Sequence, residues 1–230
     1  MQVSRNDKLI TRRNKYAGYA TLAGLICAIG ALAGFFFLQQ NILIWTVCII
    51  LSLLFSAYGN YAMRRWGRPP RPDQIIEKEL KGLDDKYHLY AWNLPVPYVL
   101  LSQQGVYAFA TRDQGGKVTV NGSRWSSKFN VARIFFAFAQ EGLGNPGAEA
   151  ADQAGRLEKW IKTKSPEMQA PVQPVVLFLA DNVQLTISEP AVPVMQVEGL
   201  KKWLRGTGKS TTLKNADYRA LEQLFESAAN

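Results

Sequence analysis

The stretches YAGYATLAGLICAIGALAGFFFL (residues 16–38) and ILIWTVCIILSLLFSAYGNYAM (residues 42–63) decide the fold of this 230-residue chain. Neither contains Asp, Glu, Lys, Arg or His, and only Gln39-Gln40-Asn41 separates them. Each stretch has the ~20 residues that an α-helix needs to cross a hydrocarbon core about 30 Å thick. We therefore predict a two-helix transmembrane hairpin over residues 16–66.

Two other interpretations of these stretches are weaker. Long buried helices of a soluble protein keep a polar face, which neither stretch has. A cleaved signal peptide has a shorter apolar core, and a second apolar run does not follow it directly. Within the first stretch, Gly30 and Gly34 form a small-xxx-small pattern. Such a face packs either against the second helix of the same hairpin, which we favour, or against another copy.

Positively charged residues flank the hairpin on both sides. They are Arg5, Lys8, Arg12, Arg13 and Lys15 before it, and Arg64, Arg65, Arg68 and Arg71 after it. By the positive-inside rule both termini face the cytoplasm, which predicts a multi-pass protein of the cell membrane. The predicted domains are a basic cytoplasmic N-terminus (1–15), the hairpin (16–66), a Pro/Arg linker (67–72) and a cytoplasmic domain (73–230).

The net charge of +9 belongs mainly to these flanks. Residues 72–230 carry 18 Lys and Arg against 17 Asp and Glu, so the domain after the hairpin is close to neutral. Basic residues at a membrane surface attract anionic headgroups, and we predict the lipid bilayer as a partner. A broad basic surface for nucleic acid is correspondingly disfavoured.

The cysteine and histidine contents exclude several classes of site. Cys27 and Cys48 both lie in the apolar stretches, and His88 is the single histidine. They leave almost no material for a disulfide framework, a zinc site of several histidines, a Ser-His-Asp triad or a Cys-His pair. We expect His88 to be a surface or half-buried residue, and we predict no metal and no cofactor.

After the linker, the hydrophobic pattern predicts a mixed α/β domain around one central sheet. A helix that Asp73 would cap precedes three strands, in YHLYAWNL (87–94), PYVLLS (97–102) and GVYAFATR (105–112). A hairpin follows in KVTVNGSRW (117–125), with its turn at Asn121-Gly122.

The remaining elements alternate between helices and strands. They are a helix from Pro146 to about Lys164 capped by Asn145, a buried strand in VQPVVLFLA (172–180), one or two strands in TISEPAVPVMQV (186–197), a short helix in EGLKKWLRG (198–206) and a final helix in NADYRALEQLFESAA (215–229).

The stretch GTGKSTT (residues 206–212) is similar to the end of a phosphate-binding P-loop. That loop needs a glycine five positions before Gly208, where this chain has Trp203. It also follows a strand, whereas the preceding residues predict a helix. We therefore predict no nucleotide partner.

The motifs between Asp73 and about Ala180 occur in the order of a known family. Ile76, Leu80 and Leu83 fit a V-x-x-x-L-x-x-L helix, and PYVLLS and GVYAFATRD fit its two strands. Gly115-Gly116, Trp125, Asn145-Pro146 and PVVLFLA then follow in order. This layout resembles the nuclease-related domain (NERD) family, which implies a fold like that of restriction endonucleases.

The departures from that family fall on its catalytic positions. The resemblance implies a carboxylate on one strand and a Glu-x-Lys on the next, which hold Mg²⁺ and stabilise the attacked phosphate. Here the aspartate position is Pro97, the glutamate position is Ala110, the lysine position is Arg112 and a helix glutamine is Glu149. Proline and alanine offer no metal ligand, and arginine cannot act as a base at neutral pH. We predict a degenerate domain that is not an enzyme.

Two functions are compatible with this sequence. The first, which we favour, is a non-catalytic, membrane-anchored module that binds a protein partner or self-associates. The second is a nucleic-acid-binding or residually active metal-dependent nuclease domain. Its candidate phosphate or partner contacts are Arg112, Lys117, Arg124, Lys128 and Arg133, provided that they share one face. Arg112 could instead pair with an acidic neighbour, Asp113 or Glu149, and we favour this interpretation.

Overall fold

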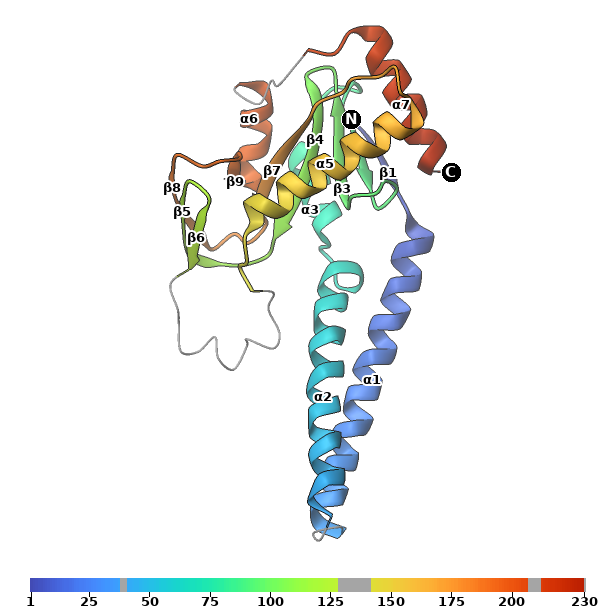
Figure 1. The fold of residues 1–230 in the computed structure, drawn as a ribbon, viewed down its shortest axis with the longest axis vertical. Coiled ribbons are helices and arrows are strands. Elements are labelled where there is room, and N and C mark those ends of the chain that lie inside the picture. The colour runs from blue at the N-terminus through green and yellow to red at the C-terminus, as the bar shows by residue number, and fades with distance from the viewer. Residues whose placement is uncertain (38–40, 128–141, 207–211, 230) are drawn as a thin grey trace. The chain divides into compact units, whose positions relative to one another are not determined.

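The computed structural model describes residues 1–37, 41–127, 142–206 and 212–229, which form two compact units (Figure 1). The helical unit spans Asp7–Arg71. The α/β unit combines Met1–Asn6 with most of the chain from Pro72 onward.

The helical unit contains two long helices, α1 (Asp7–Phe37) and α2 (Ile42–Ala62), and a π-helical turn, Met63–Gly67. Both long helices are long and apolar enough to cross a membrane. Their large apolar side chains are mostly exposed, as Leu25 and Leu54 illustrate. The predicted pair of long apolar helices is therefore confirmed. A core helix of a soluble protein would bury such side chains, which α1 and α2 do not.

Small residues let α1 and α2 approach closely. The buried residues of α1 are Ile10, Ala17, Ala20, Gly24, Ala31 and Gly34. A Cβ atom on Gly34 would lie 2.9 Å from Trp45 Cβ, and one on Gly24 would lie 2.8 Å from Ser56 Oγ. The small-residue face of α1 therefore packs against α2 of the same hairpin, as we favoured from the sequence.

Aromatic and basic side chains gather where α2 ends. The Arg13 guanidinium lies 5.6 Å from the centre of the Trp66 ring, and Arg65 lies 5.9 Å from that of Tyr61. Tyr61 and Trp66 meet edge to face. Such amphipathic rings and long basic side chains are typical of a membrane–water interface.

The α/β unit contains two sheets, where the sequence predicted one. The larger has the order β1-β2-β3-β4-β7-β9 and the smaller has the order β6-β5-β8. The larger sheet consists of β1 (Gln2–Arg5), β2 (His88–Ala91), β3 (Tyr98–Ser102), β4 (Gly105–Arg112), β7 (Val172–Phe178) and β9 (Val194–Gln196). The smaller consists of β5 (Gly116–Asn121), β6 (Arg124–Ser127) and β8 (Val183–Ser188). The stretch 186–197 thus contributes to two strands, one in each sheet.

Helices cover both faces of the larger sheet. On one face, α3 (Pro72–Leu80) and α6 (Leu200–Arg205) pack through Ile76 and Leu204 against a core that includes Leu100 and Phe109. On the other face, α5 (Pro146–Lys164) and α7 (Asn215–Ala229) pack through Leu157 and Phe225. The unit is therefore a three-layer α/β/α arrangement, as Figure 1 shows for α5 crossing the sheet.

The predicted local signals for α5 and the β5–β6 hairpin are confirmed. The Asn145 side chain accepts a hydrogen bond from the Ala148 amide, as an N-cap does. Gly122 has φ +58° in the tight turn between β5 and β6, a conformation that glycine adopts without strain.

The first strand is formed by residues that the sequence assigned to a separate N-terminus. β1 pairs in parallel with β2, with Gln2 opposite His88 and Arg5 opposite Ala91. The N-terminal ammonium group of Met1 also donates hydrogen bonds to the Leu83 carbonyl and to Asp85. The N-terminus is therefore an integral part of the α/β unit.

The predicted capping role of Asp73 is wrong. Helix α3 begins at Pro72, so Asp73 lies inside its first turn and has no exposed surface. Its carboxylate Oδ2 lies 2.9 Å from Arg5 Nε, and Arg5 also pairs with Glu77. An acidic side chain in the first helical turn that could have capped α3 instead binds β1.

The P-loop-like stretch lies largely outside the described residues, because positions 207–211 are not among them. The residues before it form α6 after a 3₁₀ turn, Val197–Gly199. The prediction of a helix at this point is confirmed, and a P-loop requires a strand there.

Candidate functional site

The positions to which the family resemblance assigns catalytic residues lie directly before β3, in the second half of β4 and in the first turn of α5. Pro97 precedes β3, and its carbonyl accepts a hydrogen bond from the Trp92 amide at 2.8 Å. Ala110 is fully buried in a core cluster that includes Val118 and Phe178. Neither residue can ligate a metal through its side chain, so these two positions serve the packing of the fold.

Arg112 and Glu149 are brought together at the end of β4. Arg112 Nη2 donates a hydrogen bond to Glu149 Oε2 at 2.5 Å, and the two form an ion pair. Arg112 also donates to the carbonyls of Thr111 and Leu143. Glu149 is one of the two acidic partners that the sequence suggested for Arg112.

Gln153 extends this ion pair, and the sequence did not predict its participation. It lies one turn after Glu149 on α5, is almost completely buried, and donates from Nε2 to Glu149 Oε1 at 2.9 Å. Arg112 and Gln153 therefore hold the two oxygens of one carboxylate. The i, i+4 spacing of Glu149 and Gln153 was the signal that could have revealed the pair.

This arrangement is a neutralised, internally bonded cluster. Three N–H groups of Arg112 already have protein acceptors, and the side chain is only 8% exposed. A phosphate could use the guanidinium only by displacing Glu149, which would leave that carboxylate beside a second anion. The geometry therefore favours a structural ion pair that joins α5 to β4.

Replacing Glu149 with alanine should lower the free energy of unfolding by about 1–3 kcal/mol, because the buried Arg112 guanidinium loses its charged acceptor. Asp152→Ala on the same helix is the matched control. Asp152 pairs with Arg156 at 3.1 Å, but both side chains are more than half exposed, so its loss should cost less than about 1 kcal/mol. Equal losses in chemical unfolding of the two variants would contradict a structural role for the Arg112 pair.

The other candidate phosphate contacts do not surround Arg112 in the described part of the chain. Lys117 on β5 and Arg124 on β6 are exposed, and the pairing of Asn121 with Arg124 puts both cations on the outer face of this hairpin. Arg112 is buried and faces Glu149. Lys128 and Arg133 lie outside the described residues.

A second polar cluster surrounds His88, and the expectation that this residue is exposed or half-buried is wrong. His88 is only 3% exposed and stacks on the Tyr90 ring with the ring centres 4.1 Å apart. Its Nε2 lies 2.9 Å from Ser4 Oγ and its Nδ1 lies 3.0 Å from the Tyr90 hydroxyl. Ser4 belongs to β1. The burial of His88 therefore depends on a strand that the residues around His88 could not predict.

Burial controls the protonation of this cluster. Desolvation lowers the pKa of His88 below its ordinary value, against the opposing effect of Glu226 and Glu222 on α7. Desolvation likewise raises the pKa of Tyr90 and of Tyr218, whose hydroxyl donates to Glu222. His88 is therefore neutral at pH 7, with one ring nitrogen carrying a lone pair.

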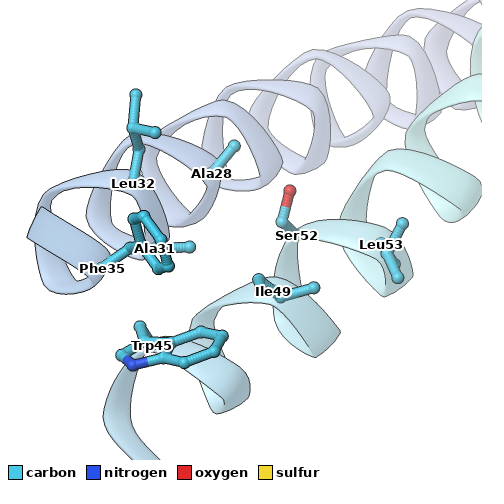
Figure 2. A pocket seen from close by; sticks show the side chains of 8 residues that line it. All are labelled: Ala28, Ala31, Leu32, Phe35, Trp45, Ile49, Ser52 and Leu53. Atoms are coloured by element: carbon cyan, nitrogen blue, oxygen red, sulfur yellow. The ribbon is translucent and has the colours of Figure 1, made fainter. Parts of the chain in front are cut away.

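The helical unit contains a groove of about 330 Å³ between its two helices (Figure 2). Its lining is apolar except for Ser52 and the indole nitrogen of Trp45. The residues that line it are Ala28, Ala31, Leu32, Phe35, Trp45, Ile49, Ser52 and Leu53. It offers contact surface for hydrocarbon and no reactive group.

Comparisons of this chain with protein-family models, with curated proteins and with solved structures find no match.

Proposed function

We propose that this protein is a membrane-anchored, non-catalytic nuclease-related domain that acts as a cytoplasmic binding or assembly module. The observation that carries the proposal is the Arg112–Glu149 ion pair at the position where the family resemblance implies a catalytic lysine. The remaining support comes from the helical unit, from the N-terminal strand and from the order of the elements.

The absence of catalysis is supported by what occupies the nuclease-like positions. A metal-dependent nuclease needs carboxylates that converge on a cation next to the attacked phosphate. Here Pro97 and Ala110 supply no ligand, and Glu149 is bonded through both oxygens to Arg112 and Gln153. The cluster keeps one carboxylate, but its charge is already compensated.

Membrane anchoring is supported by the exposed apolar surface of the helical unit. In α1 and α2 the exposed large apolar side chains are Leu, Ile, Phe and Val, together with Tyr16, Tyr19 and Tyr58. Exposed apolar surface of this extent on a soluble protein would cause association. The cluster of Tyr61, Trp66, Arg13 and Arg65 suits the headgroup region at the end of the hairpin.

The orientation is supported by the pairing of β1 with β2. Residues 2–5 precede the hairpin and residues 88–91 follow it, yet they are neighbours in one sheet. Strands of one sheet occupy one compartment, so the chain would cross the membrane an even number of times between them. The basic flanks then assign that compartment to the cytoplasm.

The nuclease-related fold is supported by the order of the elements in the larger sheet. A β2–β3–β4 antiparallel meander is followed by α5 and by β7, which pairs in parallel with β4. The part of this succession from β3 onward, two strands followed by an Asn-Pro helix start and a buried strand, has the order on which the family resemblance was based. Arg112 at the end of β4 and Asn145 at the start of α5 keep their places in that succession.

The test uses the full chain in lipid nanodiscs, incubated with fluorescent single- and double-stranded DNA and with Mg²⁺ or Mn²⁺. We expect no strand cleavage and no rise in anisotropy that depends on salt. A salt-sensitive rise would favour the alternative, a nucleic-acid-binding domain, and cleavage would overturn the claim that catalysis is lost. Lys117→Gln and Arg124→Gln would then report whether the exposed face of the β5–β6 hairpin contacts the phosphates.

The assembly part of the proposal needs a separate measurement. We expect chemical crosslinking in native membranes, followed by purification, to yield either a homo-oligomer or a defined protein partner. A chain that stays monomeric and uncrosslinked at its native abundance would contradict the proposed role.

A further inference from the structure

We propose that the α/β unit holds a divalent transition-metal ion of the zinc class between His88 on β2 and the carboxylates Glu222 and Glu226 on α7. One ligand atom from each of these residues lies within 4.8 Å of the other two. This is the one group of three such side chains within metal-binding reach among the described residues. It is separate from Arg112 and from the nuclease-like positions, and it does not depend on the proposed function.

The three ligands are presented by rigid elements. Glu222 and Glu226 are one helical turn apart, so both point to the same side of α7. Between them in the sequence, Phe225 is fully buried and meets the Tyr90 ring edge to face, with centres 5.3 Å apart. This contact directs the side of α7 that carries the two carboxylates towards β2, where His88 and Tyr90 are two residues apart on one face.

Hydroxyl groups hold the proposed ligands in place. His88 has a hydroxyl at each ring nitrogen, Ser4 Oγ at Nε2 and Tyr90 at Nδ1. The nitrogen that binds the metal gives up its hydroxyl partner to the ion, and the other nitrogen keeps a hydroxyl that fixes the ring. Tyr218 donates to Glu222 Oε1 at 3.0 Å and leaves Oε2 available. Outer-shell contacts of this kind are what orient histidine and carboxylate ligands in metal sites.

The charge and chemistry of the group select the class of metal. Two carboxylates supply negative charge and the imidazole of His88 supplies a nitrogen ligand. Nitrogen together with carboxylate oxygen favours zinc and its neighbours over calcium or magnesium, which take oxygen ligands. His88 is buried and Glu222 is half-buried, but Glu226 is exposed, so an ion could enter from the solvent side of α7.

A bound ion would join α7 to the strand next to the edge strand of the larger sheet. β2 carries His88 and pairs with β1, and α7 is the last element of the chain. The ion would therefore tie α7 to β2, two elements that lie far apart in the sequence. Because metal binds the folded arrangement only, it should raise the melting temperature of the α/β unit.

The test uses the full chain without a histidine tag, stripped with a chelator and titrated with ZnCl₂ by calorimetry in detergent. We expect one Zn²⁺ per chain and a rise in melting temperature of about 5 °C or more at a hundredfold excess over the dissociation constant. Titration with CoCl₂ should produce d–d absorption in the visible range at the same stoichiometry.

Glu226→Gln is the discriminating variant, because Glu226 is exposed and its substitution should not disturb the fold. It should weaken Zn²⁺ binding at least about tenfold, since even the loss of an outer-shell partner costs that much. Asp217→Asn removes the same charge from an exposed position of the same helix and should bind like the wild type. Absence of saturable binding by the wild type, or equal affinities of the two variants, would overturn the proposal.

Discussion

Replacing Arg5 with methionine should lower the free energy of unfolding of the α/β unit by about 3 kcal/mol. Asp73 has no exposed surface, and the Arg5 guanidinium lies 2.9 Å from its carboxylate. Removing one partner of a buried ion pair costs about 3–5 kcal/mol, because the carboxylate that stays in the interior loses a charged contact. Arg5 is a quarter exposed, which places the expected loss at the lower end. Chemical unfolding of the full chain in detergent, followed by near-ultraviolet circular dichroism, measures it.

A second substitution separates the charge effect from the loss of side-chain packing. Asp73→Asn in the Arg5→Met background removes the buried charge, so it should restore a large part of the stability. Arg124→Met is the control, because Arg124 is exposed on β6 and its replacement should change stability by less than about 0.5 kcal/mol. Additive losses in the double variant would show that the buried charge is not the cause.

The contact between Arg5 and Asp73 shows that residues 1–6 belong to the same folded unit as the chain after Pro72. A chain that starts after the linker lacks β1 and Arg5, so Asp73 loses its ion pair with Arg5. The edge of β2 also loses its parallel neighbour and exposes unpaired backbone groups. The N-terminal residues before the hairpin therefore have to remain in any chain used to study the α/β unit.

Elements with strong local signals could be predicted from the sequence. The charge-free stretches became α1 and α2, and GVYAFATR became β4 with the predicted bounds. Helix α5 begins where Asn145 and Pro146 indicated, because a cap and a proline act on adjacent backbone groups. Each of these signals is contained within a few residues or one hydrophobic period.

Contacts between residues far apart in the sequence could not be predicted. The four residues of β1 show no alternation, and their partner strand is more than eighty positions away. His88 is buried because Ser4 and α7 approach it from opposite ends of the sequence, so its environment depends on the tertiary fold alone. Asp73 satisfies a local rule for a helix cap, but tertiary pairing with Arg5 overrides that rule.

The sequence could predict which elements carry Arg112 and Glu149, but not the hydrogen bonds that these side chains form. Arg112 is the last residue of β4 and Glu149 lies in the first turn of α5, and the hydrophobic pattern alone predicted both of these elements. The bond between Gln153 and Glu149 needs the helix face that only packing determines.

Replacing Leu54 with arginine should cost about 2.5–3.5 kcal/mol of insertion free energy, if α2 spans the bilayer as proposed. Leu54 is near the middle of α2 and its side chain is 62% exposed, so the guanidinium would face hydrocarbon. In a soluble protein the same substitution at an exposed position would change stability by only about 0.5 kcal/mol or less. The cost of Leu54→Arg therefore distinguishes a helix that faces lipid from one that faces water. Protease protection after synthesis in the presence of membranes measures the inserted fraction.

Leu43→Arg on the same helix is the matched control. Leu43 is even more exposed, at 77%, but it is the second residue of α2, and an arginine there can extend its guanidinium to the interface. Insertion of this variant should therefore approach that of the wild type. Depth along α2, not exposure, would then determine the cost, which is the signature of a helix surrounded by lipid. Equal insertion of the Leu54→Arg and Leu43→Arg variants would instead indicate that the exposed face of α2 meets water or another protein.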